Sequence, residues 1–368
     1  MITRRSFLKG SVAFSLSGIS DFLNASEISN RQNLPFLISS GRSLDGKNKM
    51  LLYHLTNKDL LTFNLPKRGH GTTYSNQTSS FVLFDRSPGE YFLFNSLRRI
   101  SNKIIKVLAP EGIHFYGHGA FSNCGKKIFV TANDLTTLEG RILVYEVTDQ
   151  IKLIDNISSY GIGPHEIVRI DGTDLFWVAN GGLKTHPDTQ GSILNFDSIQ
   201  SSLTLLNDKG DLIKSYQIPG HYQSGRHLSS KSDQIIIANQ DKDFMPGVNR
   251  PIAHYVDNDQ LLDLEVSSEL YSKTKGYGAS VCLDNKKKFA VITCPKGDLI
   301  LLWDWIYHQM IHTFKAIDPA GVCFDTISNC FFITCGNGDI LKLKADSKEL
   351  TLFDTLDYQW DNHVQIIS

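Results

Sequence analysis

The chain has 368 residues, 41% of them hydrophobic, with 37 Lys or Arg against 38 Asp or Glu. This length and apolar fraction are sufficient for a large buried core. The formal net charge of −1 provides no strongly basic surface, which excludes nucleic-acid binding as the expected function. No run after the N-terminus reaches the roughly 18 apolar residues of a membrane span, so we expect none in the mature protein.

The N-terminus carries a predicted export signal. Residues 3–9 (TRRSFLK) match the twin-arginine consensus, and an apolar stretch rich in Ser and Gly follows over residues 10–23. We therefore expect residues 1–30 to be a cleaved twin-arginine signal peptide and residues 31–368 to form one periplasmic domain. A disordered N-terminal arm with chance arginines is the alternative. Many proteins exported by this route acquire a cofactor before export, which favours a bound metal or organic group.

A short phrase that ends in histidine recurs at the start of predicted strands. It occurs at residues 68–70, 116–118, 163–165, 225–227 and 361–363. Self-similarity at a spacing of roughly 40–50 residues is typical of a propeller or another repeat array. In such a ring, rotation about one axis brings equivalent residues together.

Each phrase begins the same series of predicted strands. In the second repeat these are residues 118–122, 128–133, 141–147 and 151–157, separated by turns rich in Gly, Asn and Asp. Residues 280–304 and 321–344 form two further repeats that are nearly copies of each other. Four strands per repeat is the number in a propeller blade.

The two ends of the chain decide the number of blades. Residues 35–65 provide three strands with no innermost strand before them, whereas residues 363–368 provide one innermost strand with nothing after it. Pairing these ends completes a seventh blade and removes the exposed edges of an open array. The sequence therefore predicts an all-β, seven-bladed β-propeller, its ring closed by N- and C-terminal strands that share one blade. Six or eight blades and a two-domain fold are the alternatives.

Four of the six cysteines are related by the repeat. Each of the two repeat-related pairs is separated by 41 residues, and the four residues are Cys282, Cys294, Cys323 and Cys335. The periplasm permits disulfides, but cysteines within strands are more often buried free thiols, which we expect here. A bridge between adjacent blades is the alternative. The chain has no CxxC motif, so neither a thioredoxin-like site nor a zinc knuckle is indicated.

The innermost strands of a propeller line its central channel, and their first residues lie at one mouth. His70, His118 and His165 occupy one repeat position, so the fold should direct them to a common centre. In the fourth repeat Arg226 takes this position and His227 follows it. Imidazole ligands suit Fe, Cu, Zn and Ni and disfavour Mg or Ca.

The remaining repeats make the predicted cluster one-sided. Ala279 and Ala320 occupy the histidine position in the fifth and sixth repeats, and His363 lies at or beside it in the last. An open flank suits a metal that keeps room for an exogenous group. We predict a transition-metal site, with Fe or Cu preferred and Zn not excluded, formed by His70, His118, His165 and His227. Hydrated polar side chains that bind no ligand are the alternative.

Three further residues are predicted to contact a bound group. Glu166 could complete a mixed nitrogen and oxygen shell or accept a proton from a ligating imidazole. Arg226 stands at the histidine position, and His186 lies in the long loop 181–188 near the rim. A surface loop ordered by Pro187 is the alternative for that segment.

The motifs together resemble a known family. The twin-arginine leader, RGHG at 68–71, HFYGHG at 114–119, GIGPHE at 161–166, VANGG at 178–182 followed by THPD, and RHL at 226–228 are similar to those of exported bacterial proteins labelled a domain of unknown function. That family resembles seven-bladed propellers of the YVTN and quinoprotein-dehydrogenase kind. Its members are often encoded beside imelysin-type peptidases and di-haem oxidases. The resemblance implies periplasmic iron handling with imelysin-like or cytochrome-like partners.

Three functions are compatible with these observations. The leading hypothesis is a periplasmic propeller that binds a transition metal at the channel mouth and serves metal acquisition. A non-catalytic interaction platform for an imelysin-like or cytochrome-like partner is the first rival. A lactonase-like hydrolase or an oxidoreductase that acts on a small acid is the second. The chain has no G-x-S-x-G elbow, P-loop or H-E-x-x-H motif, so nucleophilic and phosphoryl-transfer chemistry has no support in the sequence.

Overall fold

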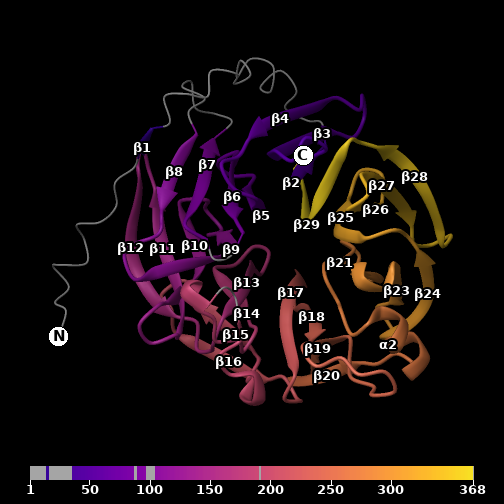
Figure 1. The fold of residues 1–368 in the computed structure, drawn as a ribbon. Helices are drawn as coiled ribbons and strands as arrows, with labels where there is room; N and C mark the ends of the chain where they lie inside the picture. The colour runs from indigo at the N-terminus through magenta and orange to yellow at the C-terminus, as the bar shows by residue number, and fades with distance from the viewer. Residues whose placement is uncertain (1–13, 16–34, 87–88, 97–103, 190–191, 368) are drawn as a thin grey trace.

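The computed structural model describes residues 14–15, 35–86, 89–96, 104–189 and 192–367. Seven antiparallel sheets stand in a ring around a central channel, which confirms the predicted seven-bladed β-propeller (Figure 1). Within these ranges the one α-helix is the short α2 (Ser268–Thr274), and no helix is long and apolar enough to cross a membrane. The predicted signal peptide lies outside the described residues, except for β1 (Phe14–Ser15), which pairs with β8.

Each blade contains four strands, named here from the channel outwards, and β1 adds a fifth strand to one sheet by pairing with β8. The blade that closes the ring, called the closing blade below, consists of β29 (Tyr358–Ile367), β2 (Phe36–Ser43), β3 (Asn48–His54) and β4 (Leu60–Asn64). The next blade consists of β5 (Gly69–Ser75), β6 (Ser80–Asp85), β7 (Tyr91–Ser96) and β8 (Ile105–Leu108). It is followed by the blade of β9 (Ile113–Phe121), β10 (Lys127–Asp134), β11 (Gly140–Val147) and β12 (Ile151–Ser158). The blade after that consists of β13 (Pro164–Arg169), β14 (Leu175–Asn180), β15 (Ser202–Asn207) and β16 (Leu212–Gln217). Three blades remain, and the first of them consists of β17 (Gln223–Lys231), β18 (Gln234–Asp241), β19 (Ala253–Asp257) and β20 (Gln260–Leu264). The second consists of β21 (Val281–Leu283), β22 (Phe289–Cys294), β23 (Leu299–Asp304) and β24 (Gln309–Lys315). The third consists of β25 (Pro319–Asp325), β26 (Cys330–Cys335), β27 (Asp339–Lys344) and β28 (Glu349–Thr355).

The ring closes by pairing the two ends of the described chain. Strand β2 pairs antiparallel with β29, with Phe36 opposite Ile367 and Ser43 opposite Tyr358. In Figure 1 the indigo strand β2 therefore lies beside the yellow strand β29. The pairing removes two strand edges that an open ring would expose. The predicted shared blade is confirmed.

Burial explains the apolar runs that revealed the repeat. The second strand of a blade packs against neighbouring blades on both faces, so every residue of β22 and β26 is buried. A strand buried on both faces has a continuous apolar sequence in place of strict alternation. Outermost strands face solvent, and β16 is largely exposed. Core packing thus holds the blades together and leaves the channel to the innermost strands.

The cysteines are free thiols, as expected from the sequence. None of the six forms a disulfide, and Cys294, Cys323, Cys330 and Cys335 are buried. Burial raises the pKa of Cys282 to about 12, so its thiol stays protonated and unreactive at neutral pH.

Candidate metal centre

A β-bulge interrupts six of the seven innermost strands near the channel mouth. A bulge places extra residues opposite one residue of the partner strand and redirects side chains. His165 is the extra residue of β13, between the pairs Pro164↔Asn180 and Glu166↔Ala179. Arg226 is the corresponding extra residue of β17, as the comparison of the repeats predicted.

The bulges differ in length. The histidines therefore do not all occupy the one repeat position that the sequence predicted for them. His70 is the first of two unpaired residues of β5, which lie opposite one residue of β6, whereas His118 is the last of three unpaired residues of β9, which lie opposite one residue of β10. His363 is likewise the last of three in β29. Bulges with one to three unpaired residues therefore bring these side chains together from slightly different repeat positions.

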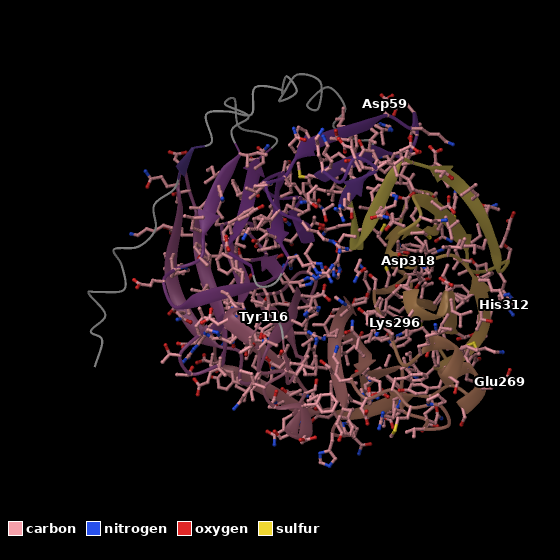
Figure 2. The ribbon with its side chains drawn as sticks, in the orientation of Figure 1. Asp59, Tyr116, Glu269, Lys296, His312 and Asp318 are labelled. Atoms are coloured by element: carbon pink, nitrogen blue, oxygen red, sulfur yellow. The ribbon has the colours of Figure 1, made fainter. Side chains whose placement is uncertain are left out.

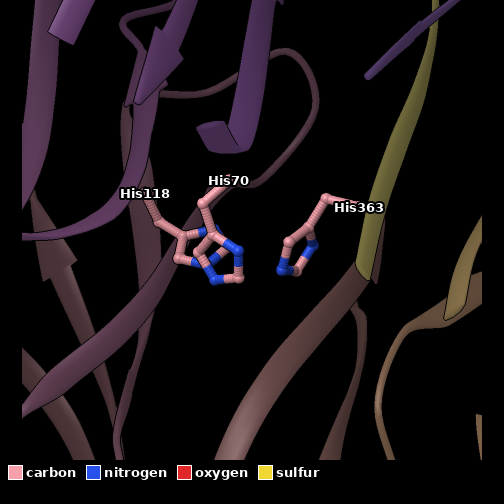
Figure 3. A group of neighbouring side chains, drawn as sticks. All are labelled: His70, His118 and His363. Carbon is pink, nitrogen blue, oxygen red and sulfur yellow. The ribbon is translucent and has the colours of Figure 1, made fainter. Parts of the chain in front are cut away.

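Five imidazole rings from five blades meet in the channel. The ring centroid of His363 lies 4.5 Å from the centroids of His70, His118 and His227. His165 lies 4.8 Å from His227 and 5.1 Å from His118. Figure 3 shows three of these rings facing one another, with His363 contributed by the C-terminal strand. The structure thus brings together all four predicted ligands and adds His363. These five residues are called the histidine cluster below.

Glycines make room for this close approach. A Cβ atom at Gly71 would lie 2.7 Å from Nδ1 of His118, and one at Gly117 would lie 2.9 Å from Cδ2 of His70. Gly117 also has a φ of +93°, a conformation that favours glycine. Gly71 and Gly117 are therefore required by the packing of these two rings.

Carboxylates orient two of the rings. Nδ1 of His70 lies 2.9 Å from Oδ1 of Asp361, whose Oδ2 accepts a hydrogen bond from Nε of Arg68 at 2.5 Å. Nδ1 of His227 lies 3.3 Å from Oε2 of Glu166. The Asp361 carboxylate holds the proton on Nδ1 of His70 and leaves the Nε2 lone pair available, as around many metal-binding histidines.

The two carboxylates differ in charge state. Burial alone would raise the pKa of Asp361, but the hydrogen bond from His70 and the positive charge of Arg68 together hold it well below its usual range. Burial raises the pKa of Glu166 to about 8, although the backbone N–H of Leu228 bonds its carboxyl at 2.7 Å. Asp361 therefore carries the fixed negative charge beside the cluster at neutral pH.

Most of the imidazoles are neutral at pH 7. Burial, reinforced by neighbouring positive charge, lowers the pKa values of His118, His165, His227 and His363 well below 6.5. Neutral imidazole has the lone pair that a metal requires, so binding displaces no proton from such a ring.

Two ring nitrogens of the cluster lack any partner. Nε2 of His118 and Nε2 of His363 are buried and have no hydrogen bond within the described chain. A buried unsatisfied polar atom costs about 1–3 kcal/mol. Three groups of side chains place one ligand atom each within 4.8 Å of one another: His70, His118 and His363; His118, His165 and His227; and Glu166, His227 and His363. The donor set fits a transition metal.

His165 is held differently from the other rings. Its Nδ1 accepts a hydrogen bond from Nη1 of Arg226 at 3.0 Å. Arginine only donates, so the neutral His165 ring carries its proton on Nε2. Nε2 of His165 therefore has no lone pair with which to bind a metal, whereas the neutral ring of His363 has one.

The cluster separates two cavities along the channel. A cavity of about 450 Å³ is lined by His118, Glu166, His227 and His363 on one side of the rings. A second cavity of about 350 Å³, called the vestibule below, lies on the other side and is lined by His70, His114, His165, His186, Arg86 and Arg226, together with Tyr116, Tyr277, Leu183 and Pro187. His227 lines both cavities. A group bound at the rings is thus reachable from two directions.

The remaining predicted site residues line the vestibule. His186 contributes from the long loop, where Nδ1 lies 3.5 Å from the Asp188 carboxylate. Arg86 and Asp361 were not anticipated from the sequence. Arg86 follows β6 without a motif, whereas Asp361 belongs to the last histidine phrase and could have been found by pairing the two chain ends.

Fold and site define the chain as a seven-bladed β-propeller whose channel is crossed by a cluster of histidines. It belongs to the family described as "Protein of unknown function (DUF1513)", whose profile matches residues 63–367. No curated protein matches the sequence.

Two solved structures share the fold at low sequence identity. One is a functionally unknown protein from Desulfotomaculum acetoxidans, 9% identical with a TM-score of 0.58, over 90% of this chain and 98% of that one. The other is Kuenenia stuttgartiensis hydrazine synthase, 11% identical with a TM-score of 0.57, over 87% of this chain and 96% of that one. At these identities the likeness concerns the fold alone.

Proposed function

We propose that the protein binds a first-row transition metal ion at the histidine cluster and serves metal acquisition in the periplasm. The unpartnered, buried Nε2 atoms of His118 and His363 are the observation that carries the proposal. A metal ion would satisfy both nitrogens at once. His70 and His227, oriented by Asp361 and Glu166, complete the proposed ligand set.

The spacing of the ligand atoms supports this assignment. Metal–nitrogen bonds of about 2.0–2.1 Å place tetrahedral ligands about 3.3 Å apart. The ligand atoms of His70, His118 and His363 lie within 4.8 Å of one another, so shifts of about 1 Å or less per side chain would bring these three to one ion, and His227 shares one group with His118 and another with His363. Imidazole with one carboxylate suits Fe, Cu or Zn.

The surroundings favour a site that exchanges its ion. Cavities of about 450 and 350 Å³ flank the rings, leaving room for an exogenous ligand. Structural metal sites are closed, whereas open positions accompany catalysis or transfer. Together with the export signal expected in residues 1–30 and the resemblance to families encoded beside iron-handling proteins, this supports a role in iron or copper acquisition with imelysin-like or cytochrome-like partners.

Metal analysis of the exported protein tests the proposal. We expect close to one Fe, Cu or Zn ion per chain, and micromolar or tighter binding when the metal-free protein is titrated with each ion. The double variant H118Q/H363Q should lose at least 100-fold in affinity. The matched control H308Q/H312Q removes two histidines of the blade formed by β21–β24; His312 lies at the outer edge of the ring (Figure 2) and the loss of both should leave affinity unchanged. A folded wild-type protein that binds none of these ions would overturn the proposal.

A further inference from the structure

The vestibule contains a guanidinium without a counter-ion. No carboxylate within the described residues forms an ion pair with Arg226, and its Nε is buried without a hydrogen-bond partner. Its Nη1 donates a hydrogen bond to a neutral imidazole, that of His165. An unpaired guanidinium in a partly desolvated site is costly and is usually matched by an anion.

The surrounding charge is also positive. Arg86 lines the same cavity at its exposed side, and Lys242 lies close enough to Arg226 for the two charges to interact. Burial, followed by the charge of Arg226, lowers the pKa of Lys242 well below its usual value, so this amine adds no fixed charge and supplies no counter-ion. The Asp361 carboxylate beside the histidine cluster is already engaged by Arg68 and His70. The described residues of the vestibule therefore carry positive charge that no negative charge among them balances.

The lining indicates the class of anion. A volume of about 350 Å³ lies at the lower end of the ~300–1,000 Å³ range of small-molecule sites. Leu183, Pro187 and the rings of Tyr116 and Tyr277 add apolar surface beside the charges, with Tyr116 toward the middle of the ring (Figure 2). This mixture suits a carboxylate that carries a short carbon skeleton better than an inorganic oxyanion.

We propose that the vestibule binds a small organic carboxylate through Arg226, and that this carboxylate and the metal ion bind cooperatively. The carboxylate site stands on the vestibule alone, whereas the cooperativity rests on the metal centre proposed above. A guanidinium binds a carboxylate best through two parallel N–H···O bonds. The coupling requires that the carboxylate take the Nη1 hydrogen of Arg226 that is now donated to Nδ1 of His165.

Release of His165 connects the two sites. Once Nδ1 no longer accepts from Arg226, the single ring proton can move from Nε2 to Nδ1, and the ring remains neutral. The Nε2 lone pair then becomes available to the group that His165 forms with His118 and His227. The carboxylate thus adds a ligand to the metal centre. Because linkage is reciprocal, the metal must tighten carboxylate binding by the same factor, typically about 5–150-fold.

Calorimetric titration with lactate and succinate, and separately with inorganic phosphate, tests the proposal on metal-free and metal-loaded protein. We expect both carboxylates to bind the metal-free protein and to bind at least fivefold more tightly once the metal is present. R226Q should weaken carboxylate binding at least tenfold and abolish the coupling. R226K retains the charge without the planar fork, so it should give an intermediate loss and serves if R226Q fails to fold. K273Q removes one charge from the α2 surface and should change nothing.

The outcomes separate the two proposals. Carboxylate binding that depends on Arg226 in a protein that binds no metal supports the vestibule site and contradicts both the metal centre and the coupling. Metal binding without any carboxylate binding overturns the vestibule site alone. Phosphate binding in preference to both carboxylates, or carboxylate binding unchanged in R226Q, also overturns it.

Discussion

His70 and Asp361 lie 291 residues apart in the sequence and are joined by a hydrogen bond of 2.9 Å between Nδ1 and Oδ1. His70 belongs to β5, and Asp361 belongs to β29 of the closing blade. The contact that orients one candidate ligand therefore exists only when the ring is closed. The site is therefore complete only when the closing blade has formed.

Asp361→Asn should weaken metal binding without removing a ligand. An amide in place of the carboxylate removes the charge that holds the proton on Nδ1 of His70, and loss of such a partner typically costs about 10–100-fold in metal affinity. Titration with Zn²⁺ or Cu²⁺ measures the loss. Arg68→Gln removes another side-chain partner of Asp361 and leaves the bond to His70 in place, so its effect should be several-fold smaller. Equal effects of the two variants would contradict an orienting role for Asp361.

The architecture could be predicted because its signals are local. Strands buried on both faces, such as β22 and β26, are continuous apolar runs, and the histidine phrases mark where each repeat begins. The unpaired strands at the two chain ends then required a shared blade. Each of these features is visible within a few consecutive residues.

The ligand set could not be predicted to the same detail because it depends on pairing across strands. The number of residues in each bulge decides where a side chain points, and that number is set by the opposing strand. For this reason His363 could be noticed but not aligned. The bond from Arg226 that occupies Nδ1 of His165 joins residues 61 positions apart and has no signal in either local sequence.

Removal of the closing strand should abolish cooperative folding. A chain that ends at Leu356 lacks β29 and leaves β2 with an exposed edge in an open ring. We expect loss of the single thermal transition and aggregation in size-exclusion chromatography. A synthetic peptide of residues 357–368, added in excess, should restore a monomeric species and the transition. A truncated chain that melts like the wild type would show that ring closure contributes little to stability.

The metal-free protein should lose stability in acid. The unfolded chain protonates its histidines near pH 6.5, whereas burial holds the pKa values of His118, His165, His227 and His363 lower, and that of His114 at about 4. Below pH 6.5 the unfolded state therefore binds more protons, and stability falls with pH toward about 4. Urea unfolding at pH 7, 5.5 and 4.5 measures the slope. H118Q/H363Q should flatten it, whereas H308Q/H312Q should leave most of it. An equal slope in all three proteins would contradict the predicted protonation states.

Glu166 should act in the opposite direction, because burial raises its pKa from 4.5 to about 8 in the folded state. Between these values the folded protein holds a proton that the unfolded chain has released, so the contribution of Glu166 to stability is full below pH 4.5 and is lost as pH rises toward 8. Glutamine resembles the protonated carboxyl and does not titrate. Glu166→Gln should therefore become more stable relative to the wild type as pH rises from 5 to 8.5, by up to a few kcal/mol at about 1.4 kcal/mol for each pKa unit.

The control for this pH effect is Glu139→Gln, which changes an exposed carboxylate paired with Arg141 and should show no such trend. Metal should reverse the effect of pH on Glu166, because a cation in the cluster stabilises the ionised carboxylate 3.3 Å from Nδ1 of His227. In metal-loaded protein the advantage of glutamine at pH 8.5 should shrink or change sign. Unfolding midpoints of the two proteins, with and without Zn²⁺ at both pH values, measure this difference. An advantage for glutamine that is the same at both pH values would show that the carboxyl is already ionised in the folded protein.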